Sequence, residues 1–137
     1  MLNGIDISSS ALIAQRQRMN TIAGNIAAVN VSYDPASGKE PYFRRVVTFQ
    51  TDTESLSQES SGVGVQYRVE IDKDKPLRKT YDPGHPHADK DGNVSYPNID
   101  MVNEFVNALA AGRSYEANIS AMEITKEMFN TSLRILA

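Results

Sequence analysis

The chain has 137 residues, of which 40% are hydrophobic, and its 17 acidic and 14 basic residues give a formal charge of −3. No run of like charge suggests a nucleic-acid partner, and the lack of cysteine excludes disulfides, thiol catalysis and cysteine-bound zinc. No apolar stretch approaches the roughly 20 residues that span a bilayer. The first residues also lack the apolar run of a cleavable signal peptide, so we expect neither an integral membrane protein nor a cleaved leader.

The first segment, from Ile5 to about Asn30, contains no proline and is predicted to be a helix. Large apolar residues recur at every seventh position, with weaker heptad positions between them: Ile5, Leu12, Met19 and Ile26, then Ser8, Gln15, Ile22 and Val29. The opposite face has small side chains where a solvated helix normally carries Glu and Lys: Ser10, Ala14, Gly24, Ala27 and Ala28. We therefore expect helix neighbours on more than one side. The alternative is an alanine-rich helix that lies on its own domain.

The last segment, from about Asn98 to Ala137, also lacks proline and would be about 60 Å long as one helix. Its apolar seam alternates spacings of four and three: Met101, Phe105, Ala108, Gly112, Tyr115, Ile119, Met122, Lys126, Phe129, Leu133 and Leu136. A helix of this length has only the first helix to pack against in a small monomer. Marginal helices gain most of their stability from packing. We therefore expect both ends to be loosely ordered in the free subunit and to become continuous helices on assembly.

The middle of the chain has a different character, with turn-forming residues around Asp34-Pro35 and Ser37-Gly38. Short strands are predicted at 46–49, at 63–71, where apolar residues alternate strictly, and at 77–81. The predicted fold is mostly α with a small β insert, in which long N- and C-terminal helices form a coiled-coil-like pair. The predicted parts are an assembly helix over 1–31, a turn-rich β insert over 32–97 and a second assembly helix over 98–137.

Residues that could carry chemistry are few. Both histidines, His85 and His87, lie in a Pro-Gly-His-Pro-His loop without a serine motif beside them, which disfavours nucleophilic catalysis. The stretch 89–92, Asp-Lys-Asp-Gly, partly resembles a calcium loop, but His87 and Asn98 occupy its first and last ligand places. A turn is the better interpretation, because Asp and Gly there favour a chain reversal. We predict no catalytic, cofactor-binding or metal-binding residues.

Several motifs carry a family resemblance. The stretch 23–30, Ala-Gly-Asn-Ile-Ala-Ala-Val-Asn, resembles the Ala-Ser-Asn-Ile-Ala-Asn-Ala-Asn signature of bacterial flagellar rod and hook proteins. The loop 81–89, Tyr-Asp-Pro-Gly-His-Pro-His-Ala-Asp, followed by Gly92, Val94 and Pro97-Asn98, is similar to a loop of the proximal-rod members of that family. Further similarities lie at Ile5-Asp6-Ile7-Ser8, Gln15-Arg16, Met19-Asn20 and Ser114-Tyr115-Glu116-Ala117-Asn118. Together these motifs span nearly the whole chain.

The resemblance implies a structural subunit of the flagellar basal-body rod, which crosses the periplasm, and export from the cytoplasm by the flagellar type III apparatus. It implies other rod subunits and copies of the same chain as partners, and terminal helices that pack into concentric tubes. It implies neither catalysis nor a cofactor. The candidate assembly interface comprises Leu12, Met19, Gly24, Asn25, Ile26, Ala27, Asn30, Tyr115, Glu116, Asn118, Ile119, Met122, Phe129, Leu133 and Leu136.

Three alternatives remain open on the sequence. The chain could be another flagellar axial protein, although the loop at 81–89 favours a proximal-rod protein. It could be a metal-responsive binding adaptor that uses the loop from His85 to Asp91, which a calcium or zinc titration would test. A small periplasmic hydrolase is disfavoured, because no nucleophile and base or metal-ligand pattern is present.

Overall fold

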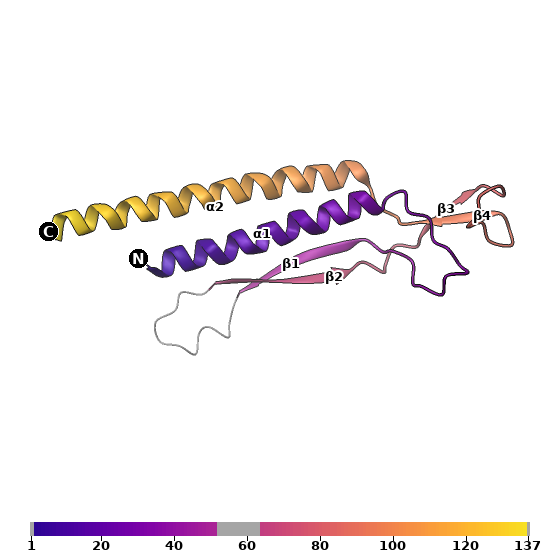
Figure 1. Ribbon diagram of the computed structural model, residues 1–137, viewed down its shortest axis with the longest axis horizontal. Helices are drawn as coiled ribbons and strands as arrows, with labels where there is room; N and C mark the ends of the chain where they lie inside the picture. Colours follow the sequence, from indigo (N-terminus) through magenta and orange to yellow (C-terminus); the bar gives the residue numbers. More distant parts are fainter. Residues whose placement is uncertain (1, 52–63, 137) are drawn as a thin grey trace.

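The computed structural model describes residues 2–51 and 64–136, and Figure 1 shows its elements. Within these ranges it contains two long helices and two antiparallel two-stranded ribbons. The elements are α1 (Leu2–Ala28), β1 (Arg45–Thr51), β2 (Val65–Ile71), β3 (Arg78–Tyr81), β4 (Asn93–Tyr96) and α2 (Met101–Leu136). The predicted fold class, two terminal helices around a small β insert, is confirmed. Both helices have bounds within about three residues of the predicted ones.

Helix α1 lies between α2 on one side and the β1–β2 ribbon on the other (Figure 1). The two helices run antiparallel. Asn25 of α1 contacts Glu104 of α2, and a Cβ atom on Gly4 would lie 3.6 Å from Cγ2 of Thr125. Since α2 has 36 residues and α1 has 27, the C-terminal end of α2 runs past the start of α1, as Figure 1 shows.

The start of α2 is fixed by an N-terminal cap. Oδ1 of Asp100 accepts hydrogen bonds from the backbone N–H of Val102 at 2.9 Å and of Asn103 at 3.3 Å. These bonds satisfy donors that have no partner within the helix, which explains why α2 begins here and not at Asn98. Pro97, which is buried, stands just before the cap and favours an extended chain at the residue before it.

The seam of α2 differs from the predicted one in its first two turns and again toward its C-terminal half. There the predicted seam residues Ile119, Phe129 and Leu133 are exposed, the last two where α2 runs past the start of α1. Met101 and Phe105 were predicted to face α1, but both are exposed, and Glu104 is buried in their place. The residues of α2 that are buried or half-buried along α1 are mostly small or polar: Glu104, Ala108, Ala111, Tyr115, Asn118, Met122 and Thr125. Glu104 can occupy this position because Arg44 and Asn25 bind its carboxylate, a pairing that apolar periodicity cannot reveal.

The small-residue face of α1 is also divided differently from the prediction. Gly24 and Ala27 are exposed, although a Cβ atom on Gly24 would lie 3.6 Å from the hydroxyl of Tyr42, and Ser10 is half-buried against the ribbon. Ala14 and Ala28 are buried inside the subunit, so their assignment to that outer face was wrong. The physical reason is that α1 has two neighbours within the chain, α2 and the β1–β2 ribbon, which together cover more than one stripe of it.

Both β ribbons are short. In the first, Phe49 stands opposite Tyr67 and Val47 opposite Val69, and the backbone N–H of Val65 donates to Oγ of Ser10 in α1 at 3.0 Å. A strand is confirmed over Val65–Ile71, while Val63 lies outside the described residues. Its alternation predicts a half-buried strand, but Tyr67, Val69 and Ile71 are exposed. Strand β4 was not predicted, because its four residues follow a turn directly and are too few for a periodic signal.

Candidate functional site

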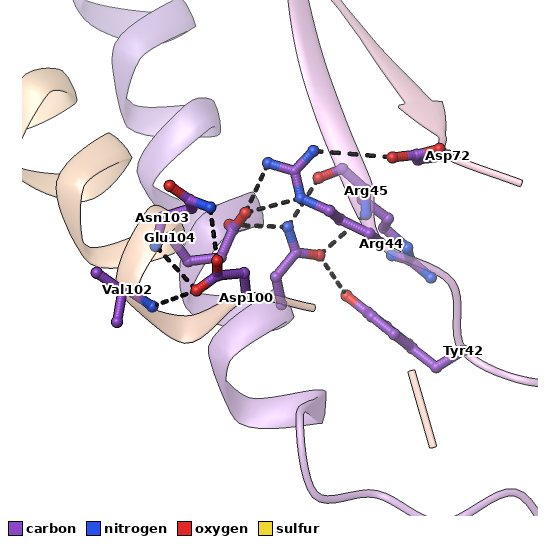
Figure 2. A network of polar contacts seen from close by, with 9 residues as sticks. Tyr42, Arg44, Arg45, Asp72, Asp100, Val102, Asn103 and Glu104 are labelled. Carbon is purple, nitrogen blue, oxygen red and sulfur yellow. Dashed lines mark hydrogen bonds and ion pairs between the residues drawn. The ribbon is translucent and has the colours of Figure 1, made fainter. Parts of the chain in front are cut away.

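A cluster of polar side chains joins α1, α2 and the start of β1 (Figure 2). At its centre is Asn25, which has no exposed surface. Its Nδ2 donates to the backbone carbonyl of Arg45 at 2.8 Å and to Oε2 of Glu104 at 3.1 Å. Its Oδ1 accepts from the backbone N–H of Arg45 at 3.0 Å and from the hydroxyl of Tyr42 at 3.2 Å. The amide thus forms four hydrogen bonds to three different parts of the chain.

The second centre of the cluster is Glu104, whose side chain is 1% exposed in the first turn of α2. Its Oε1 accepts from Nε of Arg44 at 2.8 Å and lies 2.6 Å from Nη2 of the same guanidinium, a two-pronged pairing of high directionality. Asp72, the residue after β2, has its carboxylate 3.9 Å from Nη1 of Arg44. A buried carboxylate is costly unless it is paired and hydrogen-bonded, and here it is both.

Tyr42 closes the cluster on the side of the ribbon. Burial raises the pKa of its phenol above the ordinary value of 10.0, the charge of Glu104 raises it further, and Arg45 opposes the rise. The guanidinium of Arg45 stands 5.2 Å from the centre of the Tyr42 ring. The phenol therefore stays protonated and donates to Asn25 at neutral pH.

We call Asn25, Tyr42, Arg44, Asp72 and Glu104 the polar clamp. Its polar groups bind one another: the amide of Asn25 and the carboxylate of Glu104 both find partners inside the cluster. What it does is mechanical: it fixes the axial position of α1 against α2 and of both against β1. Of its members only Asn25 was singled out from the sequence. The burial of Glu104 could have been inferred from its position seven residues before Ala111, which places both residues on the same side of the helix.

The loop between β3 and β4 forms the predicted turn at Asp89. Oδ1 of Asp89 accepts hydrogen bonds from the backbone N–H of Asp91 at 2.9 Å and of Asn93 at 2.8 Å, and Gly92 adopts a φ of 75°. The loop is tied to the segment after α1, because Nδ1 of His87 lies 2.8 Å from Oγ of Ser32. Within residues 2–51 and 64–136, no three acidic or histidine side chains are grouped as metal ligands would be.

The residues of the candidate assembly interface fall into three groups in the structure. One group is exposed: Gly24, Ala27, Asn30, Glu116, Ile119, Phe129 and Leu133. A second group is half-buried beside the seam: Leu12, Met19, Ile26, Tyr115, Asn118 and Met122. Asn25 alone is buried inside the subunit, where the polar clamp uses all its hydrogen bonds. The side chain of Leu136 lies outside the described part of the structure.

A set of large apolar side chains on α2, not predicted as an outer face from the sequence, lies on the side away from the buried residues that pack along α1. They are exposed along α2, each by more than half of its surface: Val102, Phe105, Val106, Leu109, Ile124, Met128 and Ile135. Their spacing of three, four and seven residues is the signal that could have identified a second apolar face. These residues fall into two groups, at 102–109 and at 124–135, and exposed apolar groups of this kind are typical of surfaces that bind other proteins. Neither helix, over the residues described, has an apolar stretch that could cross a bilayer.

Both ends of the chain match protein-family models of one class. Residues 5–32 match a family described as flagella basal body rod protein, and residues 90–135 match the C-terminal family of flagellar basal body rod FlgEFG proteins. These matches define the class as flagellar basal-body rod proteins, which confirms the resemblance found in the sequence.

The full-length relatives define the particular family. The chain is 38% identical over 135 residues to flagellar basal-body rod protein FlgC of Salmonella typhimurium, with 98% of this chain and 97% of the relative covered. It is 41% identical to FlgC of Aquifex aeolicus, covering 94% and 92%, and 37% identical to FlgC of Borreliella burgdorferi, covering 99% and 97%. The chain belongs to the FlgC family of flagellar basal-body rod proteins.

Proposed function

We propose that the chain is a structural subunit of the proximal rod of the flagellar basal body, which polymerises through α1 and α2 into a shaft that transmits torque. The observation that carries this proposal is the outward apolar face of α2, together with the family of the chain. Burying one large apolar side chain contributes about 1.5–3 kcal/mol. Seven such residues on one face supply enough for stable contacts with neighbours.

The seam inside the subunit supports the same proposal, because it is weaker than the outer face. On α2 it consists mainly of small or polar residues, such as Ala108, Ala111 and Asn118. On α1 it includes Gln15, whose Oε1 is buried without a hydrogen-bond partner among the described residues. An unsatisfied buried polar atom costs about 1–3 kcal/mol. We therefore expect contacts with neighbouring subunits to stabilise the two helices more than their contacts with each other do.

The polar clamp makes the subunit rigid, which is a second property that a shaft requires. A subunit that transmits torque must keep its outward faces at a fixed angle and height while force passes through it. Asn25 and Glu104 join the two helices near one end with directional hydrogen bonds, which resist sliding more than apolar contacts do. The clamp thus supports a role in positioning the assembly faces.

The partners and the place of action follow from the same proposal. Other rod subunits and copies of this chain cover α1 and α2, and the chain acts in the periplasmic part of the basal body. The predicted interface residues that are exposed or half-buried contribute to these contacts, whereas Asn25 is buried and acts inside the subunit. The flagellar type III apparatus exports it. No enzymatic activity is part of the proposal, and among the described residues no group of acidic or histidine side chains favours the metal-responsive adaptor.

The test is to supply variants to a bacterium that lacks its own copy of this protein. Val106→Glu places a charge on the outer face of α2, at a residue 58% exposed in the subunit, and should abolish rods and swimming while the soluble amount of protein is unchanged. Ala27→Glu on α1 should do the same. Asp74→Lys, which changes the charge by two units at an exposed residue in the loop after β2, is the control and should swim normally. Normal swimming of both helix variants would contradict the proposal.

A further inference from the structure

One side of α1 is exposed along most of the helix. Its residues recur at helical spacing: Asp6, Ile13, Arg16, Asn20, Ala23 and Ala27. Asp6 and Arg16 have no ion pair or side-chain hydrogen bond in the part of the chain that the structure describes. Ala23 and Ala27, toward the end of the helix, leave room for a bulky side chain from a second helix to approach closely.

Helix α2 has an exposed flank of the opposite character. Phe105 and Leu109, which are 53% and 67% exposed, are bulky where the end of α1 is small. Further along the same flank are two exposed charges, Glu116 and Lys126. Like the charges on α1, neither is paired among the described residues. The chain thus has two different exposed surfaces, and each carries charges that are unpaired among the described residues. The apolar part of the α1 surface has small side chains, whereas that of the α2 surface has bulky ones.

The charges discriminate between the ways in which these two surfaces can meet. Within one subunit the antiparallel register places Gly4 beside Thr125 and Asn25 beside Glu104. If α1 of one copy met α2 of another copy in this same register, Arg16 would face Arg113 and Asp6 would face Glu123. Both contacts join like charges, which repel each other.

A shift of three residues, about 4.5 Å along the helix axis, changes every one of these contacts. Arg16 then faces Glu116, and Asp6 faces Lys126, so that both charges meet a charge of opposite sign. The same shift places Ala23 opposite Leu109 and Ala27 opposite Phe105, so that the bulky side chains meet the small ones. One displacement therefore satisfies charge and size together.

We infer that α1 of one copy packs antiparallel against α2 of a second copy of this chain, shifted by three residues from the register inside the subunit. This inference rests on the proposed function and adds the partner and the register of one contact. The apolar side chains supply the affinity and the ion pairs select the register, since exposed ion pairs alone contribute little.

The geometry of this contact has a consequence for the assembly. The two surfaces are different, so each copy can use one surface toward the copy before it and the other toward the copy after it. Such a contact is repeated from copy to copy instead of closing into a two-fold dimer. Because each copy is displaced by about 4.5 Å along the axis relative to the last, the row of copies rises as a helix instead of closing as a flat ring.

Disulfide cross-linking tests the register directly, since the chain contains no cysteine. Copies with Ala23→Cys and copies with Leu109→Cys are produced together in a bacterium that lacks the unmodified protein, and isolated basal bodies are oxidised. A disulfide dimer is expected only when both variants are present. The matched control pairs Ala23→Cys with Val106→Cys, which would meet in the unshifted register, and should cross-link several-fold less.

The outcomes separate this inference from the proposed function. Assembled rods in which Ala23→Cys and Leu109→Cys give no dimer, or no more dimer than the control pair, would overturn the inference and leave the proposed function intact. Absence of this chain from rods assembled in the same host would instead refute the proposed function.

A charge exchange gives the answer if the cysteine variants do not assemble. Arg16→Glu should abolish or strongly reduce swimming, and adding Glu116→Arg should restore it. Adding Glu123→Arg instead, an exposed glutamate on the same helix, should not restore it. Equal swimming of the two double variants would overturn the shifted register.

Discussion

Nδ2 of Asn25, near the end of α1, donates a hydrogen bond to Oε2 of Glu104, in the first turn of α2, over 3.1 Å. This bond joins residues from the two ends of the chain that are both buried. The amide of Asn25 bonds to α2, to the start of β1 and to Tyr42, so it holds these parts of the subunit at fixed positions relative to α1. The stability of the subunit should therefore depend on this residue more than on any exposed residue of α1.

The first prediction concerns Asn25→Ala. Removing the amide leaves the backbone groups of Arg45 and one oxygen of Glu104 without this partner, and we expect a loss of about 1–3 kcal/mol in the free energy of unfolding. Urea unfolding followed by circular dichroism measures it. Asn20→Ala, an exposed asparagine on the same helix, should change stability by less than about 0.5 kcal/mol. A similar small effect of both changes would contradict the structural role of Asn25.

Arg44→Ala should be more damaging. It leaves the carboxylate of Glu104, which is 1% exposed, without the guanidinium that pairs with it. Breaking a buried ion pair from one side typically costs about 3–5 kcal/mol. Arg68→Ala removes an exposed arginine of β2 and serves as the control in the same urea titration. The role of the pair would be refuted by an Arg44→Ala subunit as stable as the control.

The apolar pattern of the sequence was sufficient for both helices and for β2, because long proline-free segments and strict alternation are strong signals. It failed at the first turns of α2, since a periodic apolar pattern assigns Phe105 to the inside and cannot represent a buried Glu104 with a partner far away in sequence. Family motifs identified Asn25 but not its partners. Contacts between Asn25, Tyr42 and Glu104 depend on the folded chain, and no local pattern encodes them.

The stability of the clamp should depend on pH in the alkaline range. The buried phenol of Tyr42 has a raised pKa, so the folded state keeps its proton when the unfolded state has begun to lose it, above pH 10.0. The unfolded state then binds fewer protons, and the free energy of unfolding falls as pH rises through this range. Urea titrations at a series of alkaline pH values should show this fall.

Tyr42→Phe should weaken the dependence on alkaline pH, although losing the hydrogen bond to Asn25 lowers stability by about 1 kcal/mol at neutral pH. Tyr81→Phe, which removes an exposed phenol, is the control and should retain the slope of the unmodified chain. The assignment to Tyr42 fails if the two variants have the same slope.

The turn between β3 and β4 offers a separate test. Gly92 has a φ of 75°, and a Cβ atom there would stand 3.1 Å from Cε2 of Tyr81 and 3.2 Å from Cβ of Pro83. Gly92→Ala should therefore lower the free energy of unfolding by about 1–2 kcal/mol. Gly84→Ala in the same loop has its nearest contact at 3.6 Å and should cost less. Equal melting temperatures for the two variants would contradict this account of the turn.

Hydrogen exchange on the free subunit tests the expectation that its ends are loosely ordered. Backbone amides near the clamp, at 20–28 and 104–111, should exchange slowest, because buried side chains surround them. Amides at 126–135 should exchange fast in the free subunit and slowly in assembled rods, since α2 extends past α1 there. Strong and equal protection along both helices of the free subunit would show that assembly does not order them.

The most direct test of the central claim is a cryo-electron microscopy map of the basal body in which the neighbours of this chain are assigned. The account predicts that the chain forms part of the rod and that adjacent subunits cover the outward apolar face of α2, including Val106 and Leu109. A map in which that face meets only solvent, or in which the chain lies outside the rod, would contradict it.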